Sequence, residues 1–165
     1  MINTYYFDAS DNGPNNTTGW TNPGNAFNGN ITDFATKSAT VSMNATGTNS
    51  PTAGTSIEQV RARMYGYIDG STTLSCQINY TAENLGVIGP MSNTTASWSS
   101  YIILSEPSGG WTWQKVNDLN AALYKSNVST GTVYVAKMEI EVTSEDIIAK
   151  ISGMTSISNI SSITL

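Results

Sequence analysis

Alternating apolar and polar residues predict a series of short β-strands along most of this chain. The two longest alternations cover residues 57–69 and 132–143. In the first, one predicted face carries Val60, Ala62, Met64, Gly66 and Ile68, and the other carries Arg61, Arg63, Tyr65 and Tyr67. In the second, the residues predicted to point inward are Tyr134, Ala136, Met138, Ile140 and Val142. Further strands are predicted at 2–8, 39–45, 72–82 and 98–104.

One short helix is predicted between these strands. Thr112 is a suitable N-cap, and it follows the Pro- and Gly-containing run 107–110, which breaks the chain. Apolar residues then recur at helical spacing, at Trp113, Val116, Leu119 and Leu123. We therefore expect a helix of about three turns that lies across one end of the sheets. Residues 25–35 are expected to form an ordered loop, and residues 83–97 a polar link.

Short strands, polar loops and a single helix together predict an all-β fold, an antiparallel β-sandwich of the jelly-roll type, over residues 1–143. A chain of 165 residues is long enough for one domain with a real core and too short for two. Only 12% of the residues are charged, which agrees with a β protein rich in Ser, Thr, Asn and Gly turns.

Residues 144–165 follow a different pattern and are predicted to be an extended C-terminal tail. Apolar side chains occupy every third position, at Ile151, Met154, Ile157, Ile160 and Ile163. Strands and helices repeat every 2 and 3.6 residues, whereas an extended, polyproline-like chain shows one apolar edge every three. Because the tail cannot bury such an edge alone, the edge should pack on the domain or on copies of itself. We expect a homo-oligomer, a trimer, in which three tails cover one another. A disordered tail is the alternative.

Charge and composition restrict the partners. The net charge is −5, and the seven Lys and Arg residues are scattered, so no basic stripe is present and nucleic-acid binding is not expected. The N-terminal sequence lacks the basic and apolar regions of a signal peptide, and no apolar run has the length of a membrane span. We therefore expect a chain that is made in the cytoplasm and does not insert into a membrane.

Candidate chemistry is sparse, and no catalytic residue is predicted. The sequence has no histidine, which removes the commonest general base and metal ligand. Its single cysteine, Cys76, lies in an alternating stretch that predicts a buried strand thiol. Glu139 and Glu141 could form a carboxylate pair, but their spacing on one strand is typical of a solvated face. We expect a protein that is not an enzyme and has no cofactor-binding residues.

Oxygen-bearing side chains around Asn28 suggest a calcium site. Asn28, Asn30 and Asp33 could supply the hard oxygen ligands that calcium prefers, with Glu139 folding back to add charge. A structural calcium ion is therefore the one candidate cofactor. The alternative is a loop held together by hydrogen bonds from its own Asn and Asp side chains.

Two motifs resemble those of galactose-binding-like, discoidin-type jelly rolls. The run Ala26-Phe27-Asn28-Gly29-Asn30, with Asp33 and Phe34, is similar to the family's N-terminal signature A-x-D-G-D-x-x-T-x-W. The run 138–142, M-E-I-E-V, resembles its closing strand. The resemblance implies a jelly roll with a structural calcium held by the signature loop and a glutamate. This chain has Asn28 and Asn30 where the signature has aspartates, and Ala35 in place of its tryptophan.

A broader resemblance covers most of the chain. The motifs G-W-T-N-P-x-N-A-F-N-G-N, W-T-W-x-x-V-x-x-L and V-Y-V-x-K-M-E-I-E-V resemble sandwich domains of tailed-phage and environmental viral structural proteins. The isoleucine-rich tail is similar to repeats of phage fibre and appendage proteins. This resemblance implies a non-enzymatic virion protein on the particle surface, a fibre, spike or decoration protein that contacts other virion proteins and attaches to the host surface.

A carbohydrate-binding module is the alternative function. Exposed aromatic rings would then stack on sugar rings of a cell-surface glycan, and the candidates are Trp20, Trp98, Trp111, Tyr65 and Tyr67. An exposed pair of such rings favours sugar binding. Burial of all four tryptophans favours a purely structural role.

Overall fold

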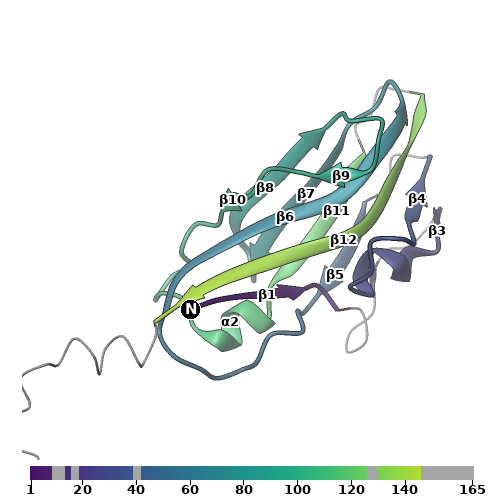
Figure 1. Ribbon diagram of the computed structural model, residues 1–165. Coiled ribbons are helices and arrows are strands. Elements are labelled where there is room, and N and C mark those ends of the chain that lie inside the picture. Colours follow the sequence, from purple (N-terminus) through teal and green to yellow (C-terminus); the bar gives the residue numbers. More distant parts are fainter. Residues whose placement is uncertain (9–13, 16–18, 39–41, 126–129, 146–165) are drawn as a thin grey trace, which may run out of the picture.

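The computed structural model describes residues 1–8, 14–15, 19–38, 42–125 and 130–145. Within these ranges the strands form two antiparallel sheets that pack face to face, with one short α-helix at one end (Figure 1). The protein is therefore the all-β antiparallel sandwich that the sequence predicts. Consecutive strands repeatedly cross from one sheet to the other, as in a jelly roll.

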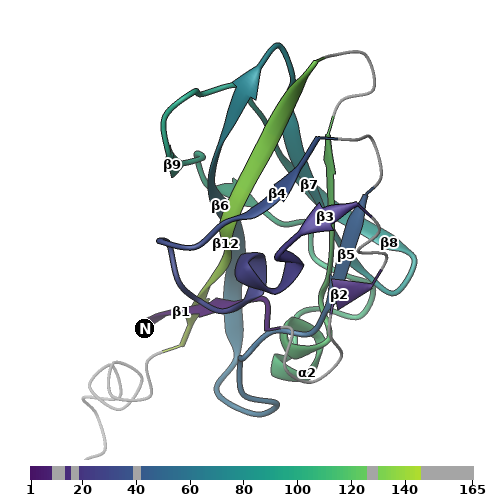
Figure 2. The same cartoon turned by 90° about the vertical axis from the view of Figure 1, so that its right-hand side faces the viewer.

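The first sheet is built on two long neighbouring strands, β6 (Ile57–Gly70) and β12 (Gly131–Ser144), which are antiparallel. Five shorter described strands complete it: β1 (Ile2–Tyr6), β3 (Trp20–Thr21), β4 (Ala35–Lys37), β9 (Ser97–Trp98) and β10 (Ile102–Ile103). The 3₁₀-helix η1 (Pro23–Phe27) lies beside β12 at the edge of the sandwich, between the two sheets, and contributes Ala26 and Phe27 to the core (Figure 2).

The second sheet contains five described strands in the order β2-β5-β11-β7-β8. Their bounds are β2 (Pro14–Asn15), β5 (Met43–Thr46), β7 (Leu74–Tyr80), β8 (Glu83–Met91) and β11 (Asn120–Lys125). The strand β8 occupies part of the predicted polar link 83–97. That prediction was wrong because β8 lies at the edge of the sheet, where polar residues such as Asn84 are solvated.

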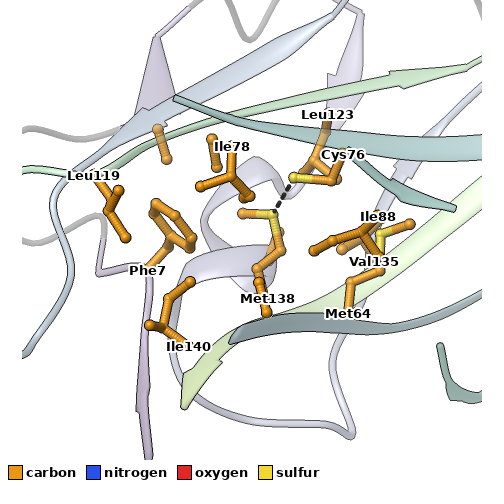
Figure 3. Packing of buried hydrophobic residues seen from close by; sticks show 14 of the residues in the cluster. Phe7, Met64, Cys76, Ile78, Ile88, Leu119, Leu123, Val135, Met138 and Ile140 are labelled. Atoms are coloured by element: carbon orange, nitrogen blue, oxygen red, sulfur yellow. Dashed lines mark hydrogen bonds between the residues drawn. The ribbon is translucent and has the colours of Figure 1, made fainter. Parts of the chain in front are cut away.

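The core lies between the two sheets and consists of apolar side chains from both (Figure 3). Met64 and Met138 come from the first sheet, and Cys76, Ile78 and Leu123 from the second; all five are buried. The Cys76 Sγ atom lies 3.3 Å from the Met138 Sδ atom. Burial raises the pKa of the Cys76 thiol, because the thiolate would lose its hydration. The prediction of a buried strand thiol is confirmed.

A β-bulge in β12 changes which residues face the core. The register against β6 shifts between Val135 and Lys137, so Val135 and Met138 both point inward across the bulge. Tyr134 therefore lies on the outer face, and the prediction that it points inward was wrong. A simple alternation counted back from Val142 cannot detect an inserted residue. Gly66 lies opposite the bulge, and a Cβ atom there would collide with the Tyr134 carbonyl oxygen.

The predicted helix is present but shorter than expected. Helix α2 (Trp113–Asn117) has five residues, and the Thr112 hydroxyl caps it by accepting a hydrogen bond from the Lys115 amide at 3.2 Å. Figure 1 shows α2 beside β1 at one end of the sandwich, which is the predicted position. Leu123, expected on the helix, lies instead in β11, where the backbone pairs with β5 and β7. The tertiary pairing overrides the local helical spacing.

Two other segments differ from the expectation. Residues 25–27, expected within the ordered loop 25–35, belong instead to η1, which has Pro23 at its first turn. The predicted strand 98–104 is divided into β9 and β10, which pair with different parts of β6.

The two ends of the sandwich chain meet beside β1. The Met1 amino group donates a hydrogen bond of 2.6 Å to the Ser144 carbonyl oxygen, where β12 ends. Residues 146–165 lie outside the described residues, so the extended tail and its trimer remain predictions. Among the described residues no helix is long and apolar enough to cross a membrane.

Candidate functional site

The outer face of β6 and β12 gathers most of the aromatic and charged side chains of the first sheet. Four cross-strand pairs follow one another along this face, and each joins residues directly opposite in register. The pairs are Arg61 with Glu141, Arg63 with Glu139, Tyr65 with Lys137, and Tyr67 with Tyr134. The predicted Arg and Tyr face of β6 is thus confirmed, and the bulge in β12 brings Tyr134 to the same side.

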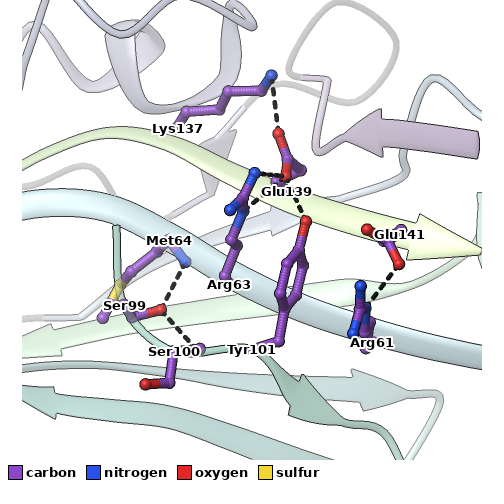
Figure 4. Close-up of polar contacts among 9 residues, drawn as sticks. All are labelled: Arg61, Arg63, Met64, Ser99, Ser100, Tyr101, Lys137, Glu139 and Glu141. Carbon is purple, nitrogen blue, oxygen red and sulfur yellow. Dashed lines mark hydrogen bonds and ion pairs between the residues drawn. The ribbon is translucent and has the colours of Figure 1, made fainter. Parts of the chain in front are cut away.

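The first part of this face, which we call the charged half, consists of Arg61, Arg63, Lys137, Glu139 and Glu141 with Tyr101. The Arg61 Nε atom lies 2.6 Å from a Glu141 oxygen. Three groups converge on the Glu139 carboxylate (Figure 4): Arg63 Nη2 at 2.6 Å, the Tyr101 hydroxyl at 3.0 Å and Lys137 Nζ at 3.3 Å. Every charge of this half therefore has a partner of opposite sign.

Glu139 and Glu141 are more buried than the sequence suggests. Their exposed fractions are 4% and 8%, whereas a solvated pair of strand carboxylates is expected from sequence. The hydrogen bond from Arg61 holds the pKa of Glu141 below its ordinary value. Burial, reinforced by the hydrogen bond to Glu139, raises the pKa of Tyr101. Both carboxylates are held by cations and hydroxyls, which is the arrangement of a stabilising network and not of a general acid and base.

Aromatic rings cover the two arginines. The Arg63 guanidinium lies 4.0 Å from the Trp98 ring centroid and 4.4 Å from that of Tyr101. The Arg61 guanidinium lies 4.2 Å from the same Tyr101 ring. Each such cation–π contact stabilises by about 0.5–2 kcal/mol. The segment 98–101, which runs along the edge of β6 between β9 and β10, thus places the Trp98 and Tyr101 rings over the arginines of the charged half.

The second part, the aromatic half, consists of Phe34, Tyr65, Tyr67, Trp98 and Tyr134. The Tyr67 and Tyr134 rings are stacked, with centroids 4.2 Å apart and planes at 3°. Phe34 meets Tyr67 edge-on at 5.3 Å, and Trp98 meets Tyr65 at 5.2 Å. All five side chains are half-buried. Burial, with Tyr134 and Asp69 nearby, raises the pKa of Tyr67, so its hydroxyl stays a neutral hydrogen-bonding group.

Exposure divides the four tryptophans of the chain into two pairs. Trp20 and Trp113 are 7% exposed and belong to the core. Trp98 and Trp111 are half-buried, and Trp98 joins the aromatic half. Phe34, Tyr134 and Tyr101 complete the face and were missed by the sequence reading. Only the register of strands distant in sequence brings these three residues together. For Phe34 alone, the position of an aromatic residue directly after the Asn-rich loop could have indicated a binding surface.

The calcium candidates Asn28, Asn30 and Asp33 form a locally bonded loop. The Asn28 side-chain oxygen accepts from the Asn30 amide at 2.9 Å, and Asn30 Nδ2 donates to an Asp33 oxygen at 2.9 Å. Glu139, the fourth candidate, directs its carboxylate to Arg63, Lys137 and Tyr101. Within the described ranges no group of three or more His, Cys, Asp or Glu side chains could hold a metal ion. Calcium binding by this loop stays a prediction.

The predicted oligomerisation residues lie beyond residue 145 and so outside the described residues. They are Ile151, Met154, Ile157, Ile160 and Ile163.

No protein-family model and no curated protein matches this chain. Among solved structures, a similar one is described as TmCBM61 in complex with beta-1,4-galactotriose. The two share 5% sequence identity, and the alignment covers 76% of this chain and 79% of that one, with a TM-score of 0.43.

Proposed function

We propose that this domain is a non-enzymatic glycan-binding module and that the sugar binds on the aromatic half. One observation carries the proposal. Five half-buried aromatic side chains from β6, β9, β12 and the residue before β4 meet on one outer face of a sheet, beside a fixed set of charges. The core between the sheets already stabilises the sandwich, so a second aromatic cluster on the solvent side suggests a role other than stability.

The chemistry of the aromatic half suits a sugar. Aromatic rings offer apolar surface to the C–H groups of a pyranose ring, and tyrosine hydroxyls offer hydrogen bonds to its hydroxyl groups. Because the cluster is held by ring-to-ring packing, little side-chain freedom is lost when a ligand binds. Preorganised aromatic side chains are therefore a low-cost way to hold a polyhydroxylated ligand.

The neighbouring charges favour an uncharged glycan. Arg61 and Arg63 each face a carboxylate, and Lys137 lies 3.3 Å from Glu139. An acidic sugar would have to displace a carboxylate from one of these cations. A neutral hexose oligosaccharide meets no such competition.

Isothermal titration calorimetry of the full chain with neutral and with sialylated oligosaccharides tests the proposal. We expect binding of a neutral glycan, and Tyr67→Ala and Tyr134→Ala should each weaken it about tenfold, because a central aromatic contact contributes more than about 1 kcal/mol. Tyr124→Ala is the matched control, a half-buried tyrosine on the outer face of the second sheet. Equal losses for all three variants, or no binding of any glycan, would overturn the proposal.

Display on a virion surface is our second proposal, and the direction of the fold favours it. Tyr67 and Tyr134 lie toward the Gly70 and Gly131 end of the long strands, whereas β12 ends at Ser144 next to Met1. A tail starting there would leave the aromatic half pointing away from its anchoring point. The sequence support is the period of three in residues 151–163 and the resemblance to phage appendage proteins.

Sedimentation of the full chain tests the oligomer on which that display rests. We expect a trimer for the native chain and a monomer for the Ile157→Asp, Ile160→Asp double variant, with little change in melting temperature. A monomer in both cases would remove the support for assembly through the tail.

A further inference from the structure

An apolar pocket lies at the end of the sandwich where β12 stops. It has a volume of about 360 Å³. Mainly apolar atoms line it, and the residues that matter here are Met1, Tyr5, Ala53, Trp113 and Glu145. Figure 1 shows the start of β1, the end of β12 and helix α2 meeting at this end. The pocket is distant in sequence and in register from the aromatic half and has no role in the proposed glycan binding.

The walls of this pocket are held in place. The Trp113 indole donates a hydrogen bond of 2.6 Å to the Thr55 carbonyl oxygen. The Tyr5 ring meets the Trp113 ring edge-on, with centroids 5.8 Å apart. A pocket whose walls are fixed in this way stays open without a ligand, and its apolar atoms remain in contact with water.

One large apolar side chain of the pocket wall is also exposed. Met1, which lines the pocket, has an exposed fraction of 64%, among the highest of the large apolar residues described. A single exposed apolar residue is common, but one that adjoins an apolar pocket enlarges a patch that favours a covering segment.

The chain itself supplies a suitable segment. Glu145 lines the pocket, and its amide donates to the Ser56 carbonyl oxygen at 2.9 Å, so the backbone is fixed at the rim. The next residues are Asp146, Ile147 and Ile148. An extended chain advances at most about 3.6 Å per residue, so the two isoleucines can reach at most about 7 and 11 Å from Glu145. Because Glu145 itself lines the pocket, both isoleucines can reach it.

We propose that Ile147 and Ile148 of the same chain dock in this end pocket, against Trp113, Tyr5 and Met1. Because Glu145 already tethers the segment, docking orders only a few residues and needs no association between molecules. The buried isoleucines remove apolar surface of the pocket from water. Docking fixes the point from which the period-three segment starts at Ile151.

Trypsin cleavage after Lys150 tests the docking in the full chain. Lys150 lies two residues beyond Ile148, so docking slows its cleavage. The double variant Ile147→Asp, Ile148→Asp should be cut several-fold faster, and so should Ala53→Asp, which places a charge in the pocket from its exposed rim. The double variant Ile157→Asp, Ile160→Asp is the control and should be cut at the native rate.

The indole N–H resonance of Trp113, assigned from a Trp113→Phe variant, provides a second measurement. It should shift in the Ile147→Asp, Ile148→Asp variant and keep its native position in the control. Equal cleavage rates in all proteins, or faster cleavage of the control, would overturn the proposal; the latter would assign the protection to tail assembly. A native resonance position that changes on dilution would overturn it as well, because the occupant would then come from a second copy.

Discussion

The charged half and the aromatic half of the outer face lie on the same two strands but differ in how their side chains are satisfied. In the charged half, the carboxylates of Glu139 and Glu141 are nearly buried and each contacts a cation. In the aromatic half, the rings of Tyr67 and Tyr134 contact each other and stay half-buried. One strand pair can therefore build a closed network of paired charges at one end and a half-exposed cluster of aromatic rings at the other.

The largest stability effect is expected in the charged half. Glu139→Gln removes the negative charge that Arg63 and Lys137 share, and leaves a cation beneath an aromatic cover. We expect a loss of about 2 kcal/mol in the free energy of unfolding, below the full cost of breaking a buried pair because Arg63 is partly solvated. Urea denaturation measures it. Glu58→Gln, an exposed glutamate of the same strand β6, should change stability by less than about 0.5 kcal/mol.

A smaller effect on stability is expected in the aromatic half. Tyr134→Leu keeps apolar area but removes the stacked pair with Tyr67, so we expect a loss of about 1 kcal/mol. The same variant should lose most of its glycan affinity, whereas Glu139→Gln should change affinity little at temperatures where it stays folded. If Tyr134→Leu destabilised the fold more than Glu139→Gln, the two halves would not differ as described.

The dependence of stability on pH should arise mainly from carboxylates of the charged half. The pKa of Glu141 is lowered in the folded protein, so the unfolded chain takes up a proton first as the pH falls. The contribution of Glu141 is therefore complete above its unfolded pKa of about 4.3 and is lost as the pH falls through the lower folded pKa. Thermal melts from pH 6 to pH 3 should show a flatter decline for Glu141→Gln than for the native chain. Tyr134→Leu should leave that decline unchanged.

The smallest effect is expected where the charged half is most solvated. Arg61 pairs with Glu141 and lies over Tyr101, and Lys would keep the charge while losing the flat stacking surface. We expect Arg61→Lys to cost about 0.5 kcal/mol, measured by urea denaturation. A loss as large as that of Glu139→Gln would mean that stacking, and not the paired charge, holds this half together.

The sequence predicted the parts of this fold that depend on local alternation. The residues of β6 from Arg61 to Tyr67 were assigned to the correct face, because each decision needed only the neighbours two positions away. The class of fold followed from many such strands and polar loops. The Thr112 cap was also readable, since a cap depends on a few adjacent residues.

Features that depend on distant partners were not predictable. The bulge beside Val135 reverses which side chains point inward in the first part of β12. The residues around it carry no sequence signal for the inserted position. The strand β11 was taken as helix because Leu119 and Leu123 fit a helical spacing that the pairing with β5 and β7 overrides. The site needed Phe34 and Tyr134 to meet, and their contact follows from sheet register alone.

The bulge restricts which residues can replace Gly66 during evolution. Gly66 lies opposite it, and any side chain there would meet the Tyr134 carbonyl oxygen. A substitution at codon 66 would have to push the two long strands apart or move the inserted residue, and moving it would turn Tyr134 inward. Neutral drift should therefore stop at this codon. Gly66, although its backbone conformation is ordinary, should then be as conserved among related sequences as a residue that contacts a ligand.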